Sequence, residues 1–187
     1  MLDLEARRST LGASEIGAVA GVNPWKTALD VWASKVGITD GAVHSQATSV
    51  GQALEAPLLE RLYAAPRGYE LTYPGTVVHA QEKWISATPD ALATDNHDTT
   101  RASYNVEAKV VGVRMFDAWG ERAEEIPPYV LCQVQWQMLV TGYACSHVVA
   151  LLGTEVRVYG IPRDKEMIAD LIAIGRDFWF GNVVPNK

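Results

Sequence analysis

The spacing of hydrophobic residues divides the chain into a mostly helical first half and a second half of short strands. The stretch SEIGAVAG (14–21) predicts a helix with Ser14 as its N-cap. TALDVWASKVG (27–37) predicts a second helix, which ends at Gly37 because glycine accepts the backbone conformation common just after a helix.

A third helix is predicted over 50–65 (VGQALEAPLLERLYAA), after a loop over 37–49. Pro57 is expected to kink this helix because proline lacks the backbone N–H that the helix needs. Four-residue spacing predicts one apolar face, formed by Leu54, Leu58 and Leu62.

From residue 70 onward the period changes to that of strands, with β-branched and aromatic residues in short runs. The predicted strands are 70–73, 76–80, 84–88, 91–94, 104–111, 147–152 and 156–161. Between the fifth and sixth lies a nearly all-apolar helix over 127–142, and a last helix covers 163–182. Since a strand-helix-strand order favours a right-handed crossover, we expect a parallel pair within a mixed sheet. The pattern predicts one α/β domain over 1–187 with a central mixed sheet flanked by helices.

Composition supports an ordinary globular protein of 187 residues, with 48% hydrophobic and 20% charged residues. The polar start and the shortness of the apolar runs predict no signal peptide and no membrane contact. Two cysteines and four scattered histidines form no zinc or disulfide pattern, which indicates a cytoplasmic protein. The net charge of −6 argues against a generally basic nucleic-acid coat, but allows a local basic groove.

The hairpin around YNVEAKVV carries the candidate chemistry. Glu107 and Lys109 share one face of a strand because side chains alternate. If Thr94 pairs with Ser103, antiparallel counting places Asp90 opposite Glu107, about 5 Å apart at Cβ. Two carboxylates that close repel one another unless they share a proton or a cation, so we expect a divalent metal ion. The alternative is a solvent-facing strand with an ordinary Glu-Lys pair and Asp90 in a turn.

Two helices offer further polar residues. Glu55 lies at the margin of an apolar stripe and serves either a metal site or a salt bridge on the helix surface. Gln133 and Gln137 form one polar stripe, at four-residue spacing, on the apolar helix. Gln135 points the other way, as a core or surface hydrogen-bonding group.

Five motifs follow one another along the chain: LGASEIGAVAGVNPWKTALDVWASKVG, GQALE, ATPDAL, VEAKVV and YVLCQVQWQMLVTG. In this order they resemble the motifs of the phage lambda-type alkaline exonucleases, the YqaJ-like viral recombinases of the PD-(D/E)xK nuclease superfamily. The resemblance spans almost the whole chain and implies a restriction-endonuclease-like core.

The same resemblance implies roles for the residues of the hairpin. Asp90 and Glu107 would bind Mg²⁺, or Mn²⁺ as a substitute, together with the carbonyl oxygen of Ala108. Glu55 would serve a second metal ion or its waters. Lys109 would orient the attacking water and stabilise charge on the scissile phosphate.

Three further assignments follow from the resemblance. Gln133 matches a glutamine that supports the active site. Arg7, or its neighbour Arg8, matches an arginine that receives the 5′-phosphate. Ser14 would lie in the same pocket.

The implied function is 5′→3′ exonuclease digestion of linear double-stranded DNA to mononucleotides, leaving 3′ single strands for phage-type recombination by strand annealing. The implied partners are DNA ends, a single-strand annealing protein and two further copies in a homotrimeric ring, inside a bacterial host. Modest basic residues, Lys26, Lys35 and Arg114, would face the ring's channel. Trp25, expected to be exposed, would serve the channel, a subunit contact or simple packing.

Two alternatives remain. One is another PD-(D/E)xK nuclease, either an endonuclease or a RecB- or Cas4-like enzyme, although two cysteines cannot hold the iron-sulfur cluster of a Cas4-like protein. The other is a non-catalytic DNA-binding recombination module, which would typically have lost Asp90, Glu107 or Lys109.

Overall fold

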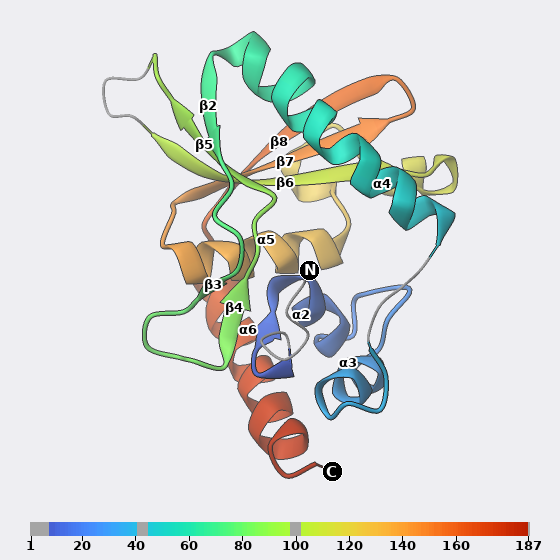
Figure 1. The fold of residues 1–187 in the computed structure, drawn as a ribbon, viewed down its shortest axis with the longest axis vertical. Helices are drawn as coiled ribbons and strands as arrows, with labels where there is room; N and C mark the ends of the chain where they lie inside the picture. The colour runs from blue at the N-terminus through green and yellow to red at the C-terminus, as the bar shows by residue number, and fades with distance from the viewer. Residues whose placement is uncertain (1–7, 41–44, 98–101, 187) are drawn as a thin grey trace.

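A five-stranded mixed sheet forms the centre of the computed structural model, which describes residues 8–40, 45–97 and 102–186 (Figure 1). The strands are β1 (Leu11–Gly12), β2 (Tyr69–Thr72), β3 (Val77–Val78), β4 (Ile85–Ala87), β5 (Ala91–Asp95), β6 (Ser103–Val111), β7 (Cys145–Leu152) and β8 (Glu155–Pro162). The α-helices are α2 (Ala13–Val19), α3 (Ala28–Lys35), α4 (Gln46–Pro57), α5 (Pro128–Thr141) and α6 (Lys165–Phe178). Shorter helical turns are η1 (Leu58–Ala64), η2 (Ala65–Arg67), η3 (Val113–Ala118), η4 (Ala123–Glu125) and η5 (Trp179–Val183).

The strand order of the large sheet is β2-β5-β6-β7-β8. Strands β6 and β7 are parallel and joined through α5, while the other neighbours are antiparallel. The predicted parallel pair and mixed sheet are therefore confirmed. Strands β3 and β4 do not join this sheet as one continuous meander; they form a second sheet with β1, in the order β1-β4-β3. Gly75, between β2 and β3, has a φ of 67°, a left-handed turn through which the chain leaves the large sheet.

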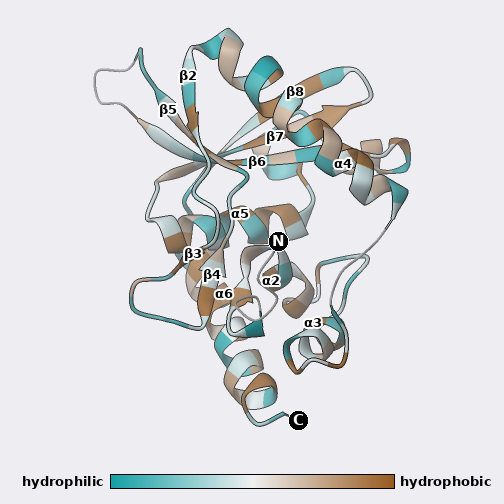
Figure 2. Ribbon diagram, in the orientation of Figure 1, coloured by the Kyte–Doolittle hydropathy of each residue, from teal (hydrophilic) through white to brown (hydrophobic). Residues whose placement is uncertain are grey.

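Helices cover both faces of the large sheet (Figure 1). Helix α4 and η1 pack on one face, whereas α5 packs on the other. The far side of α5 contacts α2, α6 and β4, so this helix is enclosed by protein on both sides. Its nearly all-round apolar sequence follows from this double burial. Figure 2 shows hydrophobic and hydrophilic positions mixed around α4, none of whose residues is fully buried.

Two predicted helix starts are wrong. Helix α2 begins at Ala13 with Gly12 as its N-cap, and Ser14 is exposed in its first turn. The Oε2 atom of Glu15 accepts the backbone N–H of Gly12 at 2.9 Å, so a glutamate rather than the serine satisfies the free amide. Helix α4 begins at Gln46, inside the predicted loop, because the side chain of Ser45 caps it.

The predicted apolar face on 50–65 is also wrong. Leu54 and Leu62 are 37% and 48% exposed. The buried residues of η1 are Leu58, Leu59, Tyr63 and Ala64. They recur at five-residue spacing because the chain after Pro57 forms a π-helix, whose hydrogen bonds span five residues instead of four.

A buried ion pair fixes α3 to α2. Nζ of Lys35 lies 2.6 Å from Oε2 of Glu15, and the two side chains are 2% and 7% exposed. Lys35 therefore does not face a DNA channel, contrary to the sequence-based expectation. Within the described part of the chain, no helix has the length and apolar character needed to cross a membrane.

Candidate active site

The β5–β6 hairpin has the register expected from the sequence. Thr94 pairs with Ser103, and Ala91, the first residue of β5, pairs with Val106. Asp90 immediately precedes Ala91, so the same register brings it opposite Glu107.

Strand β6 has a free edge where these two carboxylates lie. Beyond Val106 it continues to pair with β7 on one side, but β5 no longer pairs with it on the other. There the Oδ2 atom of Asp90 accepts the backbone N–H of Ala108 at 2.8 Å. The carboxylate of Asp90 thus accepts a backbone hydrogen bond that a neighbouring strand would otherwise accept, and this bond fixes Asp90 next to Glu107.

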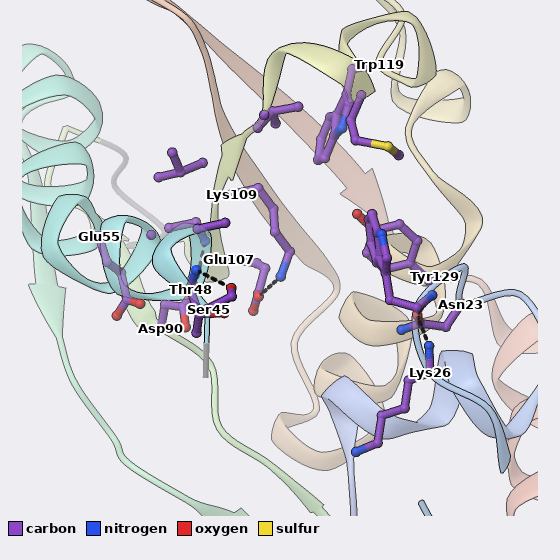
Figure 3. Close-up of a pocket in the computed structure, with 18 residues that line it drawn as sticks. Asn23, Lys26, Ser45, Thr48, Glu55, Asp90, Glu107, Lys109, Trp119 and Tyr129 are labelled. Carbon is purple, nitrogen blue, oxygen red and sulfur yellow. Dashed lines mark hydrogen bonds and ion pairs between the residues drawn. The ribbon is translucent and has the colours of Figure 1, made fainter. Parts of the chain in front are cut away.

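Residue Glu107 is only 3% exposed, and its carboxylate accepts hydrogen bonds at both oxygens. Its Oε1 atom receives Nζ of Lys109 at 2.5 Å and Nε2 of Gln133 at 2.7 Å. Its Oε2 atom receives Nε2 of Gln137 at 2.6 Å. Lys109 also donates to Oε1 of Gln133 at 3.1 Å, which closes a ring of three side chains. Figure 3 shows Lys109 reaching along the strand toward Glu107.

Helix α5 supplies both amides. Gln133 and Gln137 are one turn apart and both face β6, as their four-residue spacing predicts. Gln135 turns away from the site: it donates to the carbonyl of Pro162 at 2.8 Å and accepts the N–H of Asp164 at 2.9 Å. Gln135 is therefore a hydrogen-bonding group of the core, one of the two alternatives that the sequence left open.

The carboxylates at the site carry more negative charge than Lys109 balances. Burial, followed by the negative charge of Glu107, raises the pKa of Asp90 to about 8, although Lys109 opposes the shift. Burial and Glu107 also raise the pKa of Glu55 above its ordinary value. Burial by itself would lower the pKa of Lys109, but the charge and hydrogen bond of Glu107 raise it overall, which keeps the ammonium protonated.

A cleft with a volume of about 710 Å³ brings Glu55, Asp90, Glu107 and Lys109 together. Figure 3 shows Glu55 on α4 on one side of the Glu107–Lys109 pair, and Lys26 and Tyr129 on the other. Of the side chains in the described ranges, no three histidines, cysteines or acidic residues converge into a ready-made metal cage.

Residues 4–144 match the family model of the YqaJ-like viral recombinase domain, which is more than half of the chain. The chain belongs to this family. A curated relative, the uncharacterized protein YqaJ of Bacillus subtilis (strain 168), is 25% identical over 186 residues. That alignment covers 97% of this chain but 56% of the relative, so the chain spans just over half of the relative's length.

Solved structures resemble this YqaJ-family chain over nearly its full length. LHK-Exo in complex with dAMP matches with a TM-score of 0.74 and 20% identity, over 95% of this chain and 90% of its own. A phage-related exonuclease from Haemophilus somnus 129PT matches with a TM-score of 0.65 and 11% identity, over 95% and 96%. The predicted restriction-endonuclease-like (PD-(D/E)xK) fold is thereby confirmed.

The predicted site residues of this YqaJ-family chain fall into three groups. Glu55, Asp90, Glu107 and Lys109 line one cleft, and Gln133 contacts it through Glu107. Ser14 is exposed on α2 and is not among the residues that line the cleft. Arg7 lies outside the described residues, while Arg8 is exposed and its guanidinium approaches Gly37.

Sequence reasoning left Gln137 and Tyr129 out of the site. The signal for Gln137 was present, since it shares a polar stripe with Gln133. Nothing in the sequence indicated that Tyr129, at the start of α5, lines the same cleft as Glu107.

Proposed function

We propose that this protein is a metal-dependent DNA exonuclease, which hydrolyses linear double-stranded DNA from 5′ to 3′ and releases mononucleotides. The observation that carries the proposal is the hydrogen-bonded ring of Glu107, Lys109 and Gln133 beside Asp90. The 3′ single strands left behind would serve recombination by strand annealing, in keeping with the viral recombinase family.

The donor set fits Mg²⁺, with Mn²⁺ as a substitute. Asp90 uses Oδ2 for the N–H of Ala108, so Oδ1 remains for a cation. Burial, followed by the charge of Glu107, raises the pKa of Asp90, and a bound divalent ion would offset both effects by stabilising the charged carboxylate. We assign Asp90, Glu107 and the carbonyl oxygen of Ala108 as its ligands, and Glu55 to a second ion or its waters. When bound, such an ion supplies Lewis-acid polarisation of a phosphoryl oxygen and a more acidic water.

Lys109 carries the second part of the chemistry. Two acceptors, on Glu107 and Gln133, fix its ammonium, which has a third N–H group to donate. That N–H would donate a hydrogen bond either to the attacking water, which it would orient, or to an oxygen of the scissile phosphate, where negative charge grows in the transition state. Because the side chain is 24% exposed, a phosphate can approach it from the cleft.

Polarity and assembly belong to the same proposal. Arg7 and Ser14 would capture the 5′-phosphate, since a guanidinium can engage two phosphate oxygens at once. A homotrimeric ring would keep an acidic 20.4 kDa chain on DNA through many cleavage steps. A single-strand annealing protein in the cytoplasm of a bacterial host would receive the product. The presence of dAMP in the LHK-Exo structure supports a mononucleotide product.

The test is digestion of linear duplex DNA labelled separately at each 5′ and 3′ end, with Mg²⁺ or with EDTA. We expect Mg²⁺-dependent release of the 5′ label first, as a mononucleotide, and no cutting of closed circular DNA. Arg7→Ala should erase the advantage of 5′-phosphorylated over dephosphorylated ends. First release of the 3′ label would overturn the polarity, and linearisation of the circle would indicate an endonuclease.

A further inference from the structure

A rigid turn precedes α3 and lines the same cleft as the catalytic candidates. The Oδ1 atom of Asn23 accepts the backbone N–H groups of Trp25 at 2.9 Å and of Lys26 at 3.1 Å. The next residue, Thr27, caps α3 and exchanges hydrogen bonds with Asp30. The backbone of Trp25 is thus fixed from both sides, so its position does not depend on the burial of its own ring.

Residue Trp25 is 64% exposed, which is unusual for a residue with so large an apolar side chain. It meets Tyr129 in an edge-to-face contact, with ring centroids 5.2 Å apart and planes inclined at 80°. Both side chains line the cleft that contains Glu107 and Lys109. The packing role considered from the sequence does not account for a ring with most of its area in solvent.

Tyr129 lies between Trp25 and the hydrogen-bonded ring of Glu107, Lys109 and Gln133. It precedes Gln133 by one turn of α5, so the two side chains are neighbours on the same helical face, roughly 5–6 Å apart at Cβ. Helix α2 supports Tyr129 closely, because a Cβ atom on Gly17 would lie 3.0 Å from Cβ of Tyr129. Lys26, beside Trp25, adds a cation to the same side of the cleft (Figure 3).

We propose that Trp25 stacks on an unpaired nucleobase at the end of the DNA strand held in the cleft, with Tyr129 as its support. The proposal rests on the nuclease function proposed above and names the part of the substrate that this side of the cleft recognises. Every base has an aromatic face, so stacking holds a strand end without reading its sequence. Lys26 provides the charge that a neighbouring phosphate requires. The aromatic pair would position the terminal nucleotide relative to Lys109.

Binding should be measured in the inactive Lys109→Ala background with Mg²⁺, so that the DNA stays intact. The probes are two linear duplexes with three unpaired nucleotides at one 5′ end, which either carry their bases or are abasic there. With Trp25 present, removal of the bases should weaken binding about tenfold, which is about 1.4 kcal/mol, because the stacking contact is lost. Trp25→Leu should weaken binding of the base-containing duplex by the same factor. This variant should then bind the base-containing and the abasic duplex equally well. Trp25→Phe should keep most of the affinity.

Phe180→Leu provides a matched control, because Phe180 is a half-exposed aromatic residue on η5 that does not line the cleft. It should bind both duplexes as the parent does. If Trp25→Leu weakens both duplexes equally, or neither, stacking is overturned and Trp25 only supports the turn. Mononucleotide release by the protein with native Lys109 separates the two proposals. If no mononucleotides are released, the nuclease function is contradicted. If they are released, but Trp25→Leu and removal of the bases weaken DNA binding additively, only the stacking is contradicted.

Discussion

Gln137 and Lys109 each donate a hydrogen bond to a different oxygen of the Glu107 carboxylate. Nε2 of Gln137 lies 2.6 Å from Oε2, and Nζ of Lys109 lies 2.5 Å from Oε1. Gln137 has no exposed surface, so no solvent competes for this bond. The carboxylate therefore has one orientation, which the buried helix α5 determines. Helix α5 therefore belongs to the core and also holds the Glu107 side chain in place.

Gln137→Leu should lower the rate of DNA hydrolysis at least tenfold, because Oε2 of Glu107 would lose its donor and the carboxylate could rotate. Loss of the partner of a buried charged group should also cost about 1–3 kcal/mol of unfolding free energy. Gln135→Leu is the matched control, since it breaks the bonds to Pro162 and Asp164 on the other side of α5. It should lose stability but keep its rate. Equal rate losses in the two variants would mean that Gln137 acts only through folding.

Lys109→Ala should abolish turnover and leave DNA affinity within a fewfold of the parent. The reason is that Lys109 is proposed to act on the water and the developing phosphoryl charge, which appear only in the transition state. Single-turnover rates and fluorescence anisotropy separate the two effects. A parallel loss of binding and turnover would make Lys109 a simple phosphate anchor.

Mg²⁺ should raise the melting temperature of the DNA-free protein, because a ligand of the folded state alone stabilises it. Asp90→Asn should abolish this increase, since it removes a charged ligand while keeping a side chain of the same shape. Asp170→Asn, an exposed change on α6, should retain the full increase. An undiminished increase in the Asp90→Asn variant would place the metal ion elsewhere.

His147 predicts a pH dependence of stability that is separate from the catalytic chemistry. The hydroxyl of Tyr63 lies 2.6 Å from Nδ1 of His147, and Tyr104 stacks on the imidazole at 4.2 Å. Burial, followed by the charge of Arg67, lowers the pKa of His147 to about 4.

The unfolded chain takes up a proton near pH 6.5 that the folded His147 resists until about pH 4. The unfolding free energy should therefore fall as the pH drops through this window, by at most about 1.4 kcal/mol per pH unit. The unfolding free energy, measured by urea unfolding at several pH values, should depend less steeply on pH in His147→Phe than in the parent protein. Tyr63→Phe should keep the slope, because it removes the hydrogen bond but not the imidazole. An unchanged slope in His147→Phe would assign the effect to other groups.

The hairpin at the site could be predicted because its geometry depends on local rules. Strand side chains alternate, and antiparallel pairing has one register, so fixing Thr94 against Ser103 also fixed Asp90 against Glu107. The polar stripe of Gln133 on α5 followed from helical periodicity in the same way.

The remaining features depend on contacts between distant segments. The sequence predicted that Lys35 is a surface cation, but it is buried because α3 packs against α2 and pairs Lys35 with Glu15. The buried face after Pro57 shifted because a π-helix replaced the expected α-helix. The contact between Trp25 and Tyr129 joins residues 104 positions apart, and no local pattern predicts it.

The most direct test of the site is the release of mononucleotides from linear duplex DNA by Glu107→Gln, in Mg²⁺, at equal protein concentration. The substitution preserves the shape of the side chain and removes the charge around which Lys109, Gln133 and Gln137 are arranged. Glu166→Gln, an exposed change in the first turn of α6, serves as the control. We predict a loss of several orders of magnitude for Glu107→Gln with its fold retained by circular dichroism, and parental activity for the control. Full activity of folded Glu107→Gln, or of the parent protein in EDTA, would contradict the metal-dependent mechanism.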